Sequence, residues 1–167
     1  MIHEPKILTF INTHDEMLKS VKMESSYMAV RRTDQQGTPT FEQLVFDEEY
    51  AILFRSLFFD ARTAIISACS AYLMESVNDT FNDEDFSDNK DFILQLCLPC
   101  TFKDQMTGSI GIKIKEYLTA YIMYRWLETK LPQEAMTYKI RSEQYLMDIK
   151  IYLGMRNCAI HRRGSHL

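Results

Sequence analysis

Two short motifs in the chain contain residue types that bind metals. Cys97 and Cys100 have the C-x-x-C spacing, and Cys158 and His161 form a later C-x-x-H pair. Together they supply the four thiolate and imidazole ligands of a tetrahedral structural zinc site. However, the two residues between the first cysteines are not the small polar residues of a zinc turn, and the second pair falls in a basic tail. We therefore expect ordinary thiols, no metal and no cofactor, with a Cys3His zinc site as the alternative.

A second group of polar residues could suggest acid–base catalysis. His14, Asp15 and Glu16 follow one another directly after Thr13. Threonine is a favoured N-cap residue, and acids are stabilised in the first turn of a helix, so capping and the helix dipole explain this group. The sequence has no glycine-rich phosphate loop, no G-x-S-x-G and no H-E-x-x-H motif. We expect that the protein is not an enzyme.

The segment from Asp79 to Asp91 is strongly acidic and contains a single lysine. Counted from Asp79 or from Asp83, it lacks both the glycine at position six and the glutamate at position twelve of an EF-hand loop. A solvated acidic loop therefore explains it better than a calcium site. Its charge could still attract a basic surface on a neighbouring protein. The candidate contact residues in this loop are Asp83, Asp85 and Asp88.

Five arginines form two small basic sets, one near the expected hairpin and one in the C-terminal tail. They are Arg31, Arg32, Arg156, Arg162 and Arg163. Two explanations stay open: solubility together with a favourable charge at a helix C-terminus, or a clamp on an acidic protein or on nucleic-acid phosphates. The net charge of -4 argues against a dedicated nucleic-acid binder, which usually has a basic excess.

The overall composition is that of one soluble globular domain. The 167 residues are 46% hydrophobic and 25% charged, and the four cysteines have no regular spacing. No N-terminal segment has the features of a secretory signal, and the longest apolar run, near residues 64–74, is too short to span a bilayer. We expect an intracellular protein that does not enter a membrane.

The N-terminal half is expected to contain one strand, one helix and one β-hairpin. Residues 7–11 are short, apolar and β-prone, as in a strand or a docking arm. A modest helix would follow from Thr13 to about Ser25. Residues 27–32 and 41–46 then both have the composition of strands, and the segment between them is rich in turn residues. This pattern predicts a β-hairpin near 27–46.

The middle of the chain predicts one long helix and one further strand. Asp47 is a plausible N-cap, and apolar residues recur at helical spacing from Tyr50 to Tyr72, so a helix ending near Ser76 or Asn78 is expected. After the acidic loop, the mainly apolar residues 92–98 are expected to form a strand, and the following proline ends that strand.

Residues 107–154 predict two helices hinged at Leu131-Pro132. The first has two adjacent apolar stripes, so it is expected to be central. Pro132 suits the first turn of the second helix, and Gly154 is expected in a left-handed conformation just beyond its end. Met147, Ile151 and Leu153 are expected to flank a buried seam in the second helix. The seam residues are Tyr138, Tyr145, Ile149 and Tyr152.

The predicted fold is therefore mainly α, of α+β type. It is a helical bundle of three long helices with a small β-hairpin and one extra strand. Residues 1–154 would form a single domain, and residues 155–167 a basic C-terminal tail. Because an isolated two-stranded hairpin is only marginally stable in water, either the helices or another subunit must cover it.

The order of elements resembles that of a known group of proteins. The residues that carry the resemblance are Leu98-Pro99, the segments 112–118 and 124–132, and, less strongly, residues 48–62. They are similar to the small head–tail connector or adaptor proteins of tailed bacteriophages and prophages of Bacteroides-type hosts. The similarity covers most of the chain, and its motifs are structural rather than catalytic.

This resemblance implies a structural virion protein located in the neck, and in the host cytoplasm during assembly. It implies a homo-oligomeric ring, commonly of twelve copies, beneath the portal protein, with the helical bundle as the ring wall. The hairpin and the tail would reach neighbouring copies, the portal, or other neck or tail proteins. The acidic loop would face a basic patch or line a channel through which DNA passes without sequence-specific binding.

Other functions stay open at this point. The long N-terminal half before Asp47 departs from the family pattern, so a tail-completion or terminator protein is an alternative. An intracellular helical module that binds and regulates a protein partner is another, and a dimer in place of a ring would favour it. A small zinc-dependent protein is the third.

Overall fold

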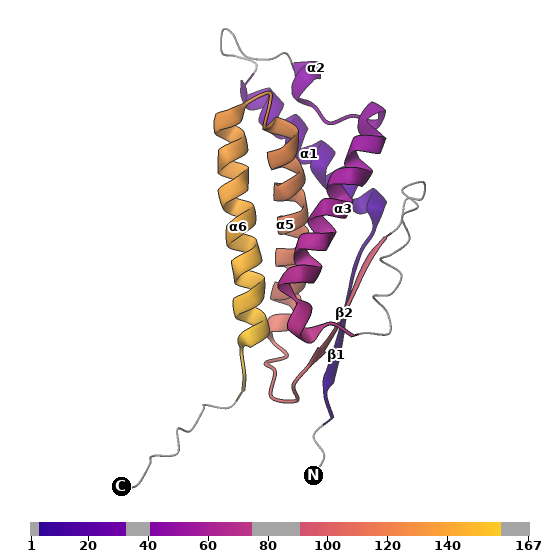
Figure 1. Ribbon diagram of the computed structural model, residues 1–167. Coiled ribbons are helices and arrows are strands. Elements are labelled where there is room, and N and C mark those ends of the chain that lie inside the picture. The colour runs from indigo at the N-terminus through magenta and orange to yellow at the C-terminus, as the bar shows by residue number, and fades with distance from the viewer. Residues whose placement is uncertain (1–3, 33–40, 75–90, 158–167) are drawn as a thin grey trace, which may run out of the picture.

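The protein is mainly helical, with a small two-stranded antiparallel sheet (Figure 1). The computed structural model describes residues 4–32, 41–74 and 91–157. The expected α+β class with predominant helix is confirmed. The expected set of three long helices is not, because four helices in the described ranges have at least 18 residues. These are α1 (His14–Arg32), α3 (Ala51–Ala68), α5 (Met106–Leu127) and α6 (Pro132–Gly154).

Helix α5 lies at the centre of the molecule. In Figure 1 it runs between α6 on one side and α3 on the other, with α1 behind it, and it contacts all three. Its buried residues, among them Ile114, Leu118 and Ile122, occupy most of its circumference. A helix that is apolar nearly all round is stable only when neighbours cover several of its sides. The expected central position is confirmed.

The α5–α6 hairpin turns where the sequence predicts it. Helix α5 ends at Leu127, whose carbonyl accepts hydrogen bonds from the N–H groups of Lys130 and Leu131. Pro132 then begins α6, where its missing N–H costs nothing. The expectation for Gly154 was wrong. Gly154 is the last residue of α6, and its conformation is not left-handed. The chain leaves the helix through Met155, which is extended (φ −72°, ψ 136°).

Strands β1 (Lys6–Asn12) and β2 (Phe92–Leu98) pair with each other in an antiparallel sheet. The register runs from Lys6 opposite Leu98 to Asn12 opposite Phe92. Every second residue of β2 is buried, so one face of the sheet covers the helices and the other is turned outward. Strand β2 was expected, and residues 7–11 were expected to form a strand or a docking arm. The pairing of β1 with β2, across about 80 residues of sequence, was not expected.

The expected β-hairpin near 27–46 does not form. Residues 27–32 continue α1, and residues 41–44 form the short helix α2 (Phe41–Leu44). The segment 33–40, which includes the expected turn, lies outside the described residues. Helix α1 therefore ends at Arg32, beyond the expected end near Ser25.

Burial explains why α1 continues. Val21, Ser25, Met28 and Ala29 have the spacing of one helical face, and all four are buried. Helix α1 contacts α5, so this face gains burial only if the backbone stays helical. That gain outweighs the β-propensity of residues such as Tyr27, which are exposed in the structure.

The residues after α2 are fixed by two hydrogen bonds to neighbouring helices. Trp126 Nε1 donates to the carbonyl of Leu44 at 2.8 Å, and the N–H of Phe46 donates to Ser25 Oγ at 2.9 Å. Both bonds are buried, so they orient the chain between α2 and α3 against α1 and α5.

Helix α3 is shorter than expected at both ends. A 3₁₀ turn, η1 (Glu48–Tyr50), precedes it. The residue at its N-cap is Tyr50, with no side-chain capping bond, so Asp47 is not the N-cap. The helix ends at Ala68 and is followed by a second turn, η2 (Ser70–Tyr72), well before the expected end near Ser76 or Asn78.

The first residues of the expected C-terminal tail pack against the domain. The N–H of Asn157 donates to the Thr101 carbonyl at 2.8 Å, and Arg156 forms an isolated antiparallel bridge with Phe102. Residues 158–167 lie outside the described residues. Residues 155–157 thus contact the segment after β2.

Candidate functional site

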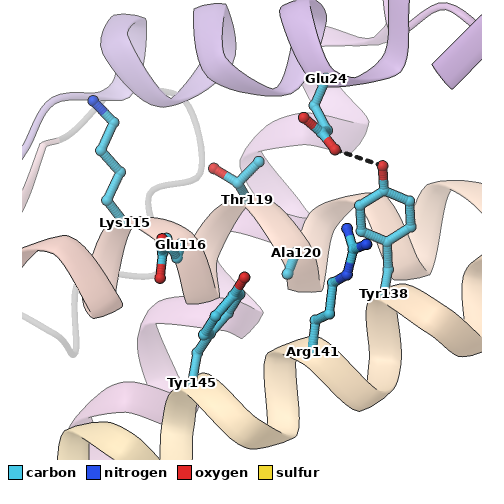
Figure 2. Close-up of a pocket in the computed structure, with 8 residues that line it drawn as sticks. All are labelled: Glu24, Lys115, Glu116, Thr119, Ala120, Tyr138, Arg141 and Tyr145. Atoms are coloured by element: carbon cyan, nitrogen blue, oxygen red, sulfur yellow. Dashed lines mark hydrogen bonds between the residues drawn. The ribbon is translucent and has the colours of Figure 1, made fainter. Parts of the chain in front are cut away.

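A polar pocket opens between α1, α5 and α6 (Figure 2). Its volume is about 270 Å³. Glu24 points into it from α1, and the four residues contributed by α5 form its floor. Tyr138, Arg141 and Tyr145 line it from α6. The α5 residues are Lys115, Glu116, Thr119 and Ala120.

The pairing of polar groups in this pocket serves helix packing. Glu24 accepts a 2.7 Å hydrogen bond from the Tyr138 hydroxyl, which links α1 to α6. Burial, followed by this bond, raises the pKa of Tyr138 above its ordinary value. Lys115 forms an ion pair with Glu16 of α1. The bond between Tyr138 and Glu24 and the ion pair of Lys115 with Glu16 each link two helices, so these contacts serve helix packing.

The remaining charges of the pocket also contact side chains of the same domain. Glu116 accepts a 2.7 Å hydrogen bond from Lys113. The Arg141 guanidinium lies over the ring of Tyr138, 5.5 Å from its centre. Lys115 and Glu116 thus pair with charged side chains, whereas Glu24 and Arg141 both contact Tyr138.

His14 is a buried core residue. Its ring packs edge-on against Phe54 at 5.0 Å, and its Nε2 has no hydrogen-bond partner within the described residues. Thr13 Oγ1 accepts a 3.3 Å hydrogen bond from the Glu16 N–H, so the expected cap of α1 is present. Asp15 is exposed, and its Oδ1 lies 3.3 Å from His14 Nδ1. The three consecutive polar residues thus take part in contacts at the start of α1.

A cationic side chain in an aromatic cluster joins α5 to the segment that contains α2. Lys130 lies over the rings of Trp126 and Tyr50, and its Nζ donates to the Gln43 carbonyl at 2.7 Å. Burial lowers the pKa of Lys130 to about 8. Sequence reasoning missed this group, because its members are far apart in the chain.

The arginines expected to form interaction sets have different surroundings. Arg31 is exposed at the C-terminal end of α1. Arg32 forms an ion pair with Glu134 of α6. Arg156 donates to the carbonyls of Leu153 and Met155 at 2.7 and 3.0 Å. These bonds cap α6, as the alternative of a helix C-terminal charge predicts.

The structure describes only some of the other expected contact and ligand residues. Cys97 and Cys100 are half-buried free thiols at the end of β2. The residues that would complete a zinc site, Cys158 and His161, lie outside the described residues, so the expectation of ordinary thiols and its zinc alternative are both untested. Also outside them are Asp83, Asp85, Asp88, Arg162 and Arg163.

Sequence reasoning missed three exposed apolar faces. The α6 outer stripe consists of Met136, Ile140, Met147 and Ile151. The α1 stripe consists of Met23, Tyr27 and Val30. The outer sheet face consists of Ile7, Ile11 and Ile93, with Ile11 and Ile93 directly opposite each other. In Figure 1, α6 and the sheet lie on opposite sides of α5.

Helical spacing could have revealed the α6 outer stripe. Met147 and Ile151 were expected to flank the buried seam, but they project away from it, whereas Leu153 is buried. Contiguous exposed apolar residues on a folded domain indicate a site of interaction. These three faces, rather than the polar pocket, are the strongest candidate functional surfaces.

Three observations concern the chain as a whole. Among the described residues, none of the helices has the length and apolar character needed to cross a membrane. In the same part of the chain, histidine, cysteine and acidic side chains form no cluster of three or more that could hold a metal ion. No protein-family model, curated protein or solved structure matches this sequence.

Proposed function

We propose that this protein is a head–tail connector or adaptor of a tailed bacteriophage or prophage, a structural subunit that forms a ring with copies of itself between portal and tail. The observation that carries this proposal is the distribution of exposed apolar residues over three separate faces. A subunit in a ring has two neighbours and contacts each of them through a different surface. A binding protein with a single partner needs one such face.

The position of the residues that resemble connector proteins supports the proposal. Segments 112–118 and 124–132 lie in α5 and in the turn that leads into α6. They build the helical hairpin at the centre of the molecule, and α5 is its most completely buried helix. In a connector, this hairpin would form the rigid wall of the ring.

The ring contacts proposed here differ from those that the sequence suggested. Residues 27–32 and 41–44 are helical, so these residues do not supply a β-hairpin that could reach a neighbour. We assign the contact between adjacent copies to the α1 stripe and the outer sheet face, which are two different surfaces, as a heterologous contact requires. Exposed Arg31 borders the α1 stripe and is available to an acidic neighbour.

The remaining partners follow from the position of such a ring. The portal would bind on one side and other neck or tail proteins on the other. DNA would pass through the ring without sequence-specific contacts, past acidic residues such as Asp83, Asp85 and Asp88. The protein would be located in the neck of the virion, and in the host cytoplasm during assembly.

The experiment is to recover the tagged full chain from its native host and image the eluate by negative-stain electron microscopy. Rings, or phage necks that contain the protein, are the expected result. The variant Tyr27→Glu, which places a charge on the α1 stripe, should abolish the rings. Ile52→Glu is the matched control, because Ile52 is an exposed apolar residue of α3 outside the three faces. A single small particle with one soluble partner would overturn the proposal and favour a helical protein-binding regulatory module.

A further inference from the structure

Helix α6 is apolar on two opposite sides. Its inner side, which includes Tyr138, Ile149 and Leu153, is buried in the domain. At about 100° per residue, the four residues of the α6 outer stripe fall within an arc of about 60° on the other side. They span 15 residues, which corresponds to about 22 Å along the helix. The fold needs only the inner side, so the straight outer stripe requires a separate explanation.

The order of residues in this stripe is self-complementary. The midpoint between Met136 and Ile151 lies between Glu143 and Gln144, and so does the midpoint between Ile140 and Met147. If two α6 helices lie antiparallel about a two-fold axis at that point, Met136 faces Ile151 of the other copy and Ile140 faces its Met147. Each apolar residue then meets an apolar residue, as an isologous interface requires.

We propose that the α6 outer stripe binds the α6 outer stripe of a second copy of this chain, antiparallel, about a two-fold axis between Glu143 and Gln144. The surface has the relief for such packing. A hollow of about 460 Å³ lies over the stripe, and Ile140, Met147 and Ile151 are among its lining residues. Apolar side chains of a partner helix can enter it as knobs enter holes.

The charges on one flank of the stripe support a second copy as the occupant. Arg141 and Asp148 project from the same flank. In this arrangement Arg141 of one copy lies beside Asp148 of the other, and the two are offset by about 3 Å along the helix axis. Asp148 is 3.9 Å from Lys113, beyond hydrogen-bond distance, so a second cation can approach it. The two-fold axis forms two Arg141–Asp148 pairs between the copies.

The opposite flank makes the contact less favourable. Glu143 lies close to the two-fold axis, so the two copies bring their Glu143 side chains near each other, with Lys139 and Lys150 supplying positive charge on either side. One helix face about 22 Å long is also smaller than a standard protein interface. We therefore expect a weak dimer that dissociates on dilution.

This inference goes beyond the proposed connector function. In a cyclic ring whose subunits all point the same way, contacts between neighbours are heterologous, whereas the α6 contact is isologous. It pairs subunits outside the ring, and it leaves the α1 stripe and the outer sheet face for ring contacts. The two proposals therefore concern different surfaces and can fail separately.

The first test is sedimentation equilibrium of the purified full chain, whose monomer mass is 19.7 kDa. The wild type should exceed the monomer mass as its concentration rises, and Tyr27→Glu, in which the proposed ring contact is disrupted, should approach twice that mass. Met147→Glu should weaken the dimer at least ~10-fold, because it buries an unpaired charge in the contact. Met23→Glu is the matched control: Met23 is 65% exposed and Met147 64%. It removes an equally exposed methionine from the α1 stripe and should leave the dimer intact.

The second test is a charge exchange. Arg141→Glu and Asp148→Arg should each weaken the dimer, and the double variant should restore it, because the pairs then form with reversed polarity. A wild type that stays monomeric at every concentration would overturn the inference. So would equal effects of Met147→Glu and Met23→Glu, or a double variant as weak as the single ones. These masses are measured on the isolated chain, so the absence of phage necks in the host would not affect the result.

Discussion

Helices α5 and α6 form one hairpin and have nearly the same length, but they distribute their apolar residues differently. On α5 the only exposed large apolar residue is Ile112, whereas α6 exposes the four residues of its outer stripe. Helix α5 has α1, α3 and α6 around it, while α6 packs mainly on α5. Burial by the fold thus accounts for the apolar residues of α5 and for only one of the two apolar sides of α6.

This difference separates residues that maintain the fold from residues available for assembly. A protein gains little by exposing a straight apolar stripe on a surface helix, since such stripes promote association. The inner side of α6 already secures the helix to the domain. The outer stripe therefore belongs with the α1 stripe and the outer sheet face as a surface for contacts between molecules.

The largest loss of stability is expected from a substitution at a buried residue of α5. Leu118 is fully buried, and Leu118→Ala should lower the free energy of unfolding by about 2–5 kcal/mol through lost burial and the cavity that remains. Ile112→Ala on the same helix, where the side chain is 59% exposed, should change it by less than about 0.5 kcal/mol. Urea unfolding followed by circular dichroism measures both, and equal losses would show that α5 is not central.

A smaller loss of stability is expected when the hydrogen bond between α1 and the segment that leads into α3 is removed. Ser25→Ala removes the acceptor of the buried Phe46 N–H and should lower the free energy of unfolding by about 1–3 kcal/mol. Ser20 also forms a hydrogen bond, to the carbonyl of Glu16, but at a half-exposed site, so Ser20→Ala is a suitable control. Hydrogen exchange at the Phe46 amide should become faster in Ser25→Ala. Unchanged exchange there would contradict this anchoring role.

The sequence predicted the regions where burial and local preference agree. Residues 92–98 are a short, mainly apolar run ended by a proline and form β2, and Pro132 marks the start of α6 in sequence and structure alike. In α1 burial and local preference conflict, because the residues around Tyr27 are β-prone, whereas burial of Met28 and Ala29 requires a helix. Packing on α5 decides in favour of helix, and this contact could not be inferred from a local pattern.

The candidate surfaces could be predicted only in part. Apolar residues at helical spacing were visible in α6, but spacing alone does not show which of two stripes faces the core. The basic residues were visible too, yet Arg32 and Arg156 contact Glu134 and backbone carbonyls of the same domain. Those partners lie on other helices or at a helix end, so only tertiary structure reveals them.

A pH-dependent effect on stability is expected at Lys130, in the turn between α5 and α6. Burial lowers its pKa from 10.5 to about 8 in the folded protein. The unfolded chain therefore binds more protons between about pH 8 and 10.5, so the contribution of this group to stability rises with pH across that window. Lys130→Met should remove this rise, measured as the difference in unfolding free energy from the wild type. Lys139→Met, at a lysine that also lies over an aromatic ring, is the control. An identical pH profile for wild type and Lys130→Met would contradict the assignment.

The smallest effect on the folded monomer is expected at the α6 outer stripe, and it should depend on protein concentration. Ile140 is 57% exposed, so Ile140→Lys should change the stability of the monomer by less than about 0.5 kcal/mol. A dimer forms from folded chains only, so the melting temperature of the wild type should rise with concentration, and that of Ile140→Lys should not. The two proteins should melt together when dilute and separate when concentrated. If Ile140→Lys melted below the wild type at every concentration, Ile140 would support the fold itself, and the outer side of α6 would serve the same purpose as α5.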